Sequence, residues 1–241
     1  MKFLFLFAFA LLSGVLHAEE TQGIVYPIKQ VSVSSPVFQE IINAILVEEG
    51  DTVNEGQPIV QLRSEREELE VLRTQKLIEV TQFKAKGADS LFKEKMGSKE
   101  KALEEKAQLE LAQILHRVAE VALKEKTIRA PLAGIVVKKY KEVGESAEKV
   151  EKLIDIVNID QVYVQFYLDP KLMQSFKKGQ SVNVRVPVIG NEEFAAEVAF
   201  IDPRIDAGSG LFRIKLQVAN ADHKIKAGMR AMADFSKLSA R

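Results

Sequence analysis

The sequence predicts a mosaic of β and α structure: a small β-sandwich split by an inserted antiparallel α-helical coiled-coil hairpin and followed by a small β-barrel domain. Three observations support this fold class. Two short stretches on either side of a charged segment share one pattern, the segment between them has the composition of long helices, and the C-terminal third alternates short apolar runs with turn residues. A chain of 241 residues can hold two to three such small domains.

The two similar stretches lie in residues 31–63 and 127–157. From Gly50 and Gly144 onward they align without a gap, so that the apolar residues of their closing strands coincide. Each half alone has too few strands to bury a face, so we expect both halves to build one sandwich. The coinciding residues are Ile59 with Leu153, Val60 with Ile154, and Leu62 with Ile156.

Residues 64–126, between the two halves, contain no proline and are rich in Leu, Ala, Glu and Lys, a composition that favours long helices. Ser64 stands at the N-cap position of the first helix, and carboxylates follow in its first turn. The two helices are expected to meet at Met96-Gly97-Ser98, where Gly97 takes a positive φ and Ser98 caps the second helix.

Each predicted helix carries an apolar stripe, and we expect the two stripes to meet as the seam of the coiled coil. At 1.5 Å per residue each arm would reach about 40 to 45 Å, much further than a small sandwich extends. The hairpin is therefore expected to contact a partner with its tip; the alternative is a mere spacer. The first stripe is Leu69, Leu72, Val80, Phe83 and Leu91, and the second is Leu103, Ala107, Leu111, Ile114, Val118 and Val121.

Residues 158–236 are predicted to form the barrel domain, and residues 237–241 a short tail. Strands of this length and spacing, interrupted by turn residues, are typical of a small barrel. Asp169-Pro170 is expected to open a short helix that ends before Gly179. The expected strands are 162–168, 181–186, 193–201 and 211–218, with a last strand from Met229.

The N-terminal block has the order of a secretory signal peptide. Residues 1–18 contain a charge at Lys2 and an apolar run shorter than the ~20 residues of a membrane-spanning helix, and we expect cleavage after Ala18. An uncleaved anchor is the alternative. The mature chain is expected to be exported, with residues 19–30 as an N-terminal strand region.

Composition and motifs argue against several functions. Lysine and arginine together number 34, as do aspartate and glutamate, so there is no excess positive charge to attract nucleic acid. The absence of cysteine excludes disulfides and Cys-ligated zinc. His116 and His223 lack a metal-ligand pattern, and Arg63 to Glu68 contains no lysine for a prosthetic group. We expect no cofactor, no metal and no catalytic site.

Several motifs agree in type and order with one protein family. Two split halves around a helical insert resemble the biotinyl/lipoyl-like domain of periplasmic adaptor subunits, the membrane fusion proteins of the HlyD kind found in RND-type efflux systems. The approach to the first half, Gly23-Ile24-Val25-Tyr26-Pro27, is similar to that of the family. The barrel motifs that match are Ile201-Asp202-Pro203, Asp206, Gly210, Arg213, Asn220 and Ala227-Gly228-Met229.

This resemblance implies a non-enzymatic adaptor in the periplasm, associated with the inner membrane through its transporter. It would link an RND-type inner-membrane pump to an outer-membrane efflux duct and form a homo-oligomer, with residues 19–30 as a reduced membrane-proximal part. Two alternatives stay open: an adaptor of an ATP-driven, ABC-type exporter, and a periplasmic scaffold whose hairpin binds an unrelated protein. The exported substrate and the number of copies are left open.

The resemblance also implies a partner-binding site at the hairpin tip. Family members carry an Arg, a Leu four residues later and a Ser seven residues after that. Leu91 and Ser98 have this separation, but Gly87 stands where the family has Arg. A neighbouring lysine would replace it imperfectly, because lysine lacks the forked donors of arginine. The tip residues expected to bind the partner are Leu91, Lys95, Met96, Gly97 and Ser98.

Overall fold

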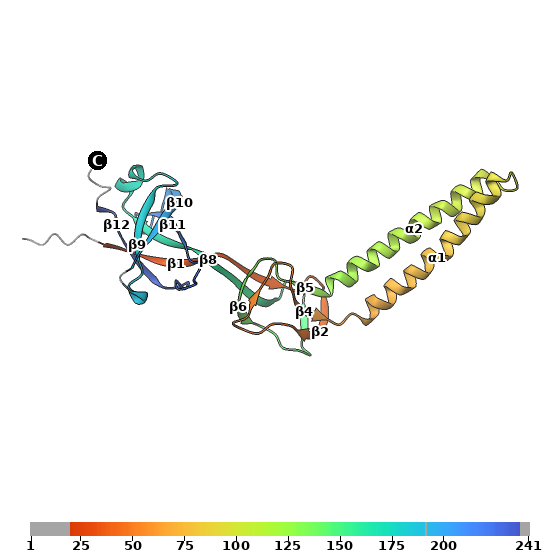
Figure 1. The fold of residues 1–241 in the computed structure, drawn as a ribbon, viewed down its shortest axis with the longest axis horizontal. Helices are drawn as coiled ribbons and strands as arrows, with labels where there is room; N and C mark the ends of the chain where they lie inside the picture. The colour runs from red at the N-terminus through yellow and green to blue at the C-terminus, as the bar shows by residue number, and fades with distance from the viewer. Residues whose placement is uncertain (1–19, 191, 237–241) are drawn as a thin grey trace, which may run out of the picture. The chain divides into compact units, whose positions relative to one another are not determined.

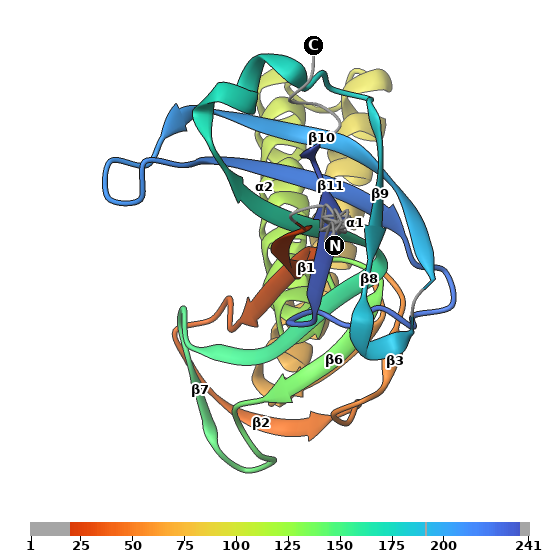
Figure 2. The ribbon, with the colours of Figure 1, turned by 90° about the vertical axis from the view of Figure 1, so that its left-hand side faces the viewer.

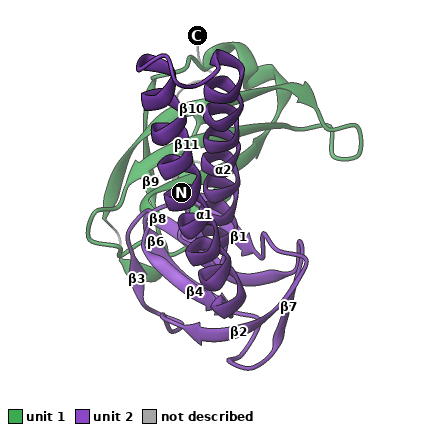
Figure 3. Ribbon diagram, turned by 90° about the vertical axis from the view of Figure 1, so that its right-hand side faces the viewer, with its two compact units in different colours: residues 1–28, 159–241 green, residues 29–158 purple. Residues whose placement is uncertain are grey.

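A computed structural model describes residues 20–190 and 192–236. The predicted signal peptide, residues 1–18, and the tail, residues 237–241, lie outside the described part. The chain divides into two compact units, one formed by residues 29–158 and the other by residues 1–28 with 159–241 (Figure 3). In its described part, no helix is both long and apolar enough to cross a membrane.

The β part of residues 29–158 combines strands from both sides of the helical insert. One sheet has the order β5-β4-β2-β7, and separately β3 pairs with β6 and β6 with the start of β8. The strands are β2 (Gln39–Ile45), β3 (Thr52–Val53), β4 (Pro58–Leu62), β5 (Thr127–Arg129), β6 (Gly134–Lys139), β7 (Ser146–Glu148) and β8 (Lys152–Leu168). Ile42 and Leu62 from the first half share one core with Val136 and Ile154 from the second, all at most 1% exposed. Burial of each such side chain contributes about 1.5–3 kcal/mol, so neither half would be stable alone.

The two halves also exchange equivalent backbone hydrogen bonds. The N–H of Gly50 donates to the carbonyl of Val136 (2.8 Å), and the N–H of Gly144 donates to the carbonyl of Ile42 (2.9 Å). Gly50 and Gly144 have φ values of 99° and 91°, a conformation that glycine adopts without steric cost. The sequence alignment of the two halves therefore corresponds to a local two-fold relationship in the structure.

Two long helices connect these halves: α1 (Glu65–Lys93) and α2 (Lys99–Glu125) fold back on each other (Figure 1). Ser98 caps α2 as predicted, because its Oγ accepts a hydrogen bond from the N–H of Lys101 (3.1 Å). Ser64 occupies the N-cap position of α1 as predicted, but its hydroxyl donates to the Glu68 carboxylate and caps no backbone N–H.

The predicted positive φ at Gly97 is also wrong. The left-handed residue of the turn is Lys95, with a φ of 63°. Gly97 is needed for space instead, because a Cβ at this position would lie 3.1 Å from Leu91 Cβ and 3.2 Å from the backbone N of Phe92. The turn therefore closes tightly against the last turn of α1.

The other unit is built around a strongly curved sheet (Figure 2). Its strands follow the order β1-β12-β9-β10-β11-β8, with an additional pairing of β1 with β8. The structure does not show the predicted barrel as a closed sheet of its own, because β8 begins at Lys152 and the same sheet continues past it through β6 and β3. The bounds are β1 (Glu20–Ser34), β9 (Ser181–Arg185), β10 (Glu193–Ile205), β11 (Phe212–Ala219) and β12 (Arg230–Asp234), with 3-10 helices at Pro170–Ser175 and Pro187–Ile189.

The core of this unit is aromatic and aliphatic. Phe166, Phe212 and Ile214 are fully buried, and the ring of Phe166 meets that of Phe235 edge to face at 5.1 Å. The start of β1 pairs antiparallel with β12, with Glu20 opposite Asp234. The first described strand therefore belongs to the same sheet as the last.

Candidate partner-binding site on the helix pair

Small and polar side chains fill the contact between α1 and α2. Ala85 from α1 and Ala112 and Ala119 from α2 are buried, as is Thr74, which is only 1% exposed. The Thr74 hydroxyl lies 3.0 Å from Nδ1 of His116 across the pair. Small residues allow the two helices to approach closely, and the Thr–His contact joins polar side chains of the two helices across their interface.

The predicted seam is therefore wrong, because both apolar stripes face solvent. Phe83 is 81% exposed in α1 and Val118 is 62% exposed in α2. Ile114 follows the buried Ala112 by two residues, which is about 200° of rotation, so the stripe of α2 points away from α1. Exposed apolar stripes of this length indicate a surface that another protein covers. Their large exposed members are Leu69, Leu72, Val80, Phe83 and Leu91 in α1, and Leu103, Leu111, Ile114, Val118 and Val121 in α2.

Lys126 anchors the base of the helix pair. Its Nζ lies 2.6 Å from the carboxylate of Glu40 in β2 and 3.2 Å from that of Glu67 in α1. Burial lowers the pKa of Lys126, but the hydrogen bonds that its ammonium donates to Glu40 and Glu67 outweigh burial, and the net pKa is raised. The bond from Lys126 likewise lowers the pKa of Glu40. One ammonium thus ties both helices to the sheet.

An open groove lies at the other end of the pair. It has a volume of about 460 Å³ and a mostly apolar lining of residues from both helices and the turn. Phe83, Gly87 and Leu91 follow one another at intervals of four residues, so they lie in one row along α1. A Cβ added at Gly87 would meet nothing within 4 Å. The groove therefore contains an open position between two large apolar side chains.

The residues expected at the tip divide into two groups. Leu91, Gly97 and Ser98 line the groove, whereas Lys95 and Met96 lie in the exposed turn outside it. Sequence reasoning did not identify Phe83 as part of this site, because its spacing placed it in the seam. The two four-residue steps from Phe83 through Gly87 to Leu91 are the signal that was available.

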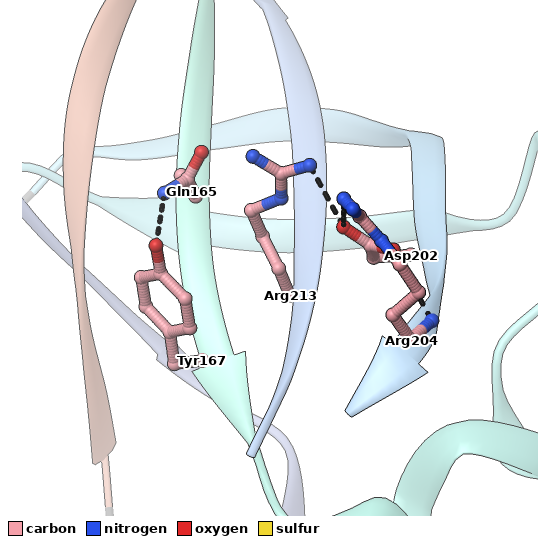
Figure 4. A network of polar contacts seen from close by, with 5 residues as sticks. All are labelled: Gln165, Tyr167, Asp202, Arg204 and Arg213. Atoms are coloured by element: carbon pink, nitrogen blue, oxygen red, sulfur yellow. Dashed lines mark hydrogen bonds and ion pairs between the residues drawn. The ribbon is translucent and has the colours of Figure 1, made fainter. Parts of the chain in front are cut away.

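A second polar cluster lies in the other unit. The carboxylate of Asp202 in β10, only 5% exposed, accepts hydrogen bonds from Arg204 (3.1 Å) and Arg213 (2.8 Å) (Figure 4). The Arg204 guanidinium holds the pKa of Asp202 well below its ordinary value. Arg213 reaches Asp202 from β11, so the cluster joins two strands where their register shifts. We assign it a structural role.

Both histidines in the described part of the chain, His116 and His223, have protein partners. His116 contacts Thr74, and Nε2 of His223 lies 2.8 Å from Asp160. No group of three or more histidine, aspartate or glutamate side chains in residues 20–190 and 192–236 is arranged to hold a metal ion.

Comparisons with known proteins agree with this architecture. Residues 161–239 match the family model of the CusB-like β-barrel domain. The chain is 27% identical over 229 residues to the nodulation protein NolF of Rhizobium meliloti (strain 1021), covering 88% of this chain and 62% of NolF. It is 26% identical over 105 residues to the putative membrane fusion protein SilB of Salmonella typhimurium, covering 44% of this chain and 24% of SilB. The chain is similar to the membrane fusion proteins.

The resemblance predicted from the sequence is thereby confirmed. The chain spans less than two thirds of the length of either relative. Among solved structures, a MacA-MexA chimera with the Pseudomonas aeruginosa MexA α-hairpin domain has a TM-score of 0.79 at 17% identity, covering 89% of this chain and 80% of the chimera. At this identity the likeness concerns the fold alone.

Proposed function

We propose that the chain is a non-catalytic periplasmic adaptor that links an inner-membrane transporter of the RND type to an outer-membrane duct in an export system. The observation that carries this proposal is the helix pair with its exposed apolar stripes and open tip. A pair that served only as a spacer would have no need for ten large apolar side chains that face water. The relationship to membrane fusion proteins supports an adaptor rather than an unrelated scaffold.

The outward stripes support assembly of several copies side by side. Each stripe faces away from the partner helix in its own chain, so α1 of one copy can pack on α2 of the next. Such a contact uses two different surfaces and leaves one of each free, which permits a ring if the rotation closes. Burial of apolar area is the driving force of this assembly.

Photo-crosslinking from the tip tests the function. A photoreactive phenylalanine analogue at Met96, which is 68% exposed and lies outside the groove, would be activated in cells that express the chain with its natural partners. We expect capture of an outer-membrane duct, identified by mass spectrometry. Capture of a soluble periplasmic enzyme instead would refute the adaptor role and favour the scaffold alternative.

The choice of an RND-type transporter has its own test. The same analogue at Tyr26, an exposed residue of β1, would be activated in cells that contain the inner-membrane transporter. Capture of a proton-driven pump supports the proposal, and capture of an ATP-driven exporter would replace it with the alternative adaptor.

A further inference from the structure

The row Phe83, Gly87, Leu91 forms a hole in the apolar surface of α1. Side chains four residues apart on a helix are neighbours, and here the middle side chain is missing. A Cβ added at Gly87 would have no atom within 4 Å apart from its chain neighbours and the backbone of its own helix, and Ala88 adds only a methyl group to the border of this space. On the α2 side, Gly97 and Ser98 close the groove with small residues. The hole thus offers an apolar side chain of a partner an open position between Phe83 and Leu91.

The charge around this hole is positive, although the chain as a whole has a net charge of zero. Residues 84–101 contain six lysines against three carboxylates, a local net charge of +3. Lys84, Lys101 and Glu105 border the groove itself. Lys101 is paired with Glu104 and Glu105, at 2.9 Å each, whereas Lys84 takes part in no ion pair among the described residues. A partner that carries carboxylates is therefore favoured over a basic or neutral one.

We infer that the Gly87 hole is a socket for one large apolar side chain of the partner, presented on a turn or helix end whose flanks are acidic. This inference rests on the proposed function and names the chemistry of the contact. The apolar side chain supplies the buried anchor, and carboxylates beside it meet Lys84. The glycine is then the residue that makes the contact possible, since any larger side chain at position 87 would occupy the socket itself.

Filling the socket tests this inference. Gly87→Leu places a side chain between Phe83 and Leu91, and because glycine is the poorer helix former, the variant is expected to have an unchanged or higher melting temperature. Gln82→Leu is the matched control, because it adds the same side chain to an exposed position of α1 outside the groove. The readout is the crosslinking yield from the photoreactive residue at position 96 to the outer-membrane protein that the unaltered tip captures.

We expect Gly87→Leu to lower this yield at least about tenfold, as loss of a central anchor does, and Gln82→Leu to leave it unchanged. Lys84→Glu should lower the yield while the socket stays open. Equal yields for Gly87→Leu and the unaltered chain would overturn the socket and leave the adaptor function standing. Capture of no outer-membrane protein by the unaltered chain would overturn both.

Discussion

The carboxylate of Glu40 lies 2.6 Å from Nζ of Lys126, although 86 positions separate the two residues in the chain. Glu40 belongs to the first half of the β core, and Lys126 directly follows α2. Lys126 also pairs with Glu67 in α1, so the three side chains link the base of the helix pair to the sheet. Each of them is less than a quarter exposed.

Removal of this ammonium should destabilise the protein. Lys126→Met leaves two partly buried carboxylates without their partner, and we expect the free energy of unfolding to fall by about 2 kcal/mol. Urea unfolding of the purified chain measures this change. Lys124→Met, an exposed position in the last turn of α2, serves as control and should change stability by no more than about 0.5 kcal/mol. Equal effects of the two substitutions would contradict the anchoring role.

The two serines before the helices should differ in their contribution to stability. Ser98→Ala removes the hydroxyl that accepts from the N–H of Lys101 and should cost about 1 kcal/mol. Ser64→Ala removes only an exposed contact with Glu68 and should cost no more than about 0.5 kcal/mol. Thermal unfolding followed by circular dichroism compares them, and a larger loss for Ser64→Ala would show that the cap has been assigned to the wrong helix.

Two glycines near the tip should respond to alanine with opposite signs. Gly87→Ala adds a methyl group in open space within a helix and should raise stability by up to about 1 kcal/mol. Gly97→Ala forces a methyl group against Leu91 and the backbone of Phe92 and should lower stability by about 1 kcal/mol. The melting temperatures of both variants, measured in parallel, check the signs. An increase for Gly97→Ala would mean that the turn has room to relax.

Much of the architecture could be predicted because it depends on local chemistry. The Gly50 and Gly144 turns, the split halves and both helices follow from turn residues, from period and from composition. The pairing of faces in the helix pair could not be predicted in this way. The face of α2 that packs on α1 also has residues at intervals of three and four. Most of these residues are alanine, glutamate or histidine, so the face does not stand out as apolar. Its positions are 102, 105, 109, 112, 116 and 119. Prediction from hydrophobicity therefore chose the wrong stripe of α2 as the seam, namely the one that faces solvent. A single sequence does not show which apolar face contacts the neighbouring helix and which is left for a partner.

The site was predicted in part for a related reason. The approximate position of the turn follows from Gly97 and Ser98, yet the positive φ occurs at Lys95 because Gly97 is used for close packing. The groove depends on a side chain that is absent at Gly87 and on residues from both helices. Such a hollow becomes visible only when the two helices are placed together.

A charge introduced into the exposed stripe of α2 and a charge introduced between the helices should change stability by different amounts. Ile114→Glu with Val118→Glu alters the exposed stripe, and each change should shift the stability of a single copy by no more than about 0.5 kcal/mol. Ala112→Glu buries a charge between the helices and should cost about 3 kcal/mol or more. Circular dichroism measures stability. Sedimentation velocity measures self-association, which the double variant should reduce. An unaltered sedimentation profile would disprove the role of the stripes in assembly.

Acid should weaken the Asp202 cluster. The pKa of Asp202 is held below its ordinary value of 3.8 in the folded state, so the stabilising effect of the carboxylate is complete above about pH 4 and is lost as the pH falls further. Asp202→Asn should therefore be less stable than the unaltered chain at pH 7, and the difference should shrink at pH 3. Urea unfolding at both pH values checks this; a constant difference would exclude the carboxylate charge as the cause.

Where the helix pair leaves the β core, its two ends are direct neighbours. Gln61 in β4 pairs with Thr127 in β5, and the N–H of Leu62 donates to the carbonyl of Lys126 (2.8 Å). Whole turns can therefore be added to or removed from both helices together without altering a single strand pairing, each matched turn changing the reach by about 5.4 Å. Insertion and deletion of matched turns alone can thus adjust the length of the helix pair during evolution.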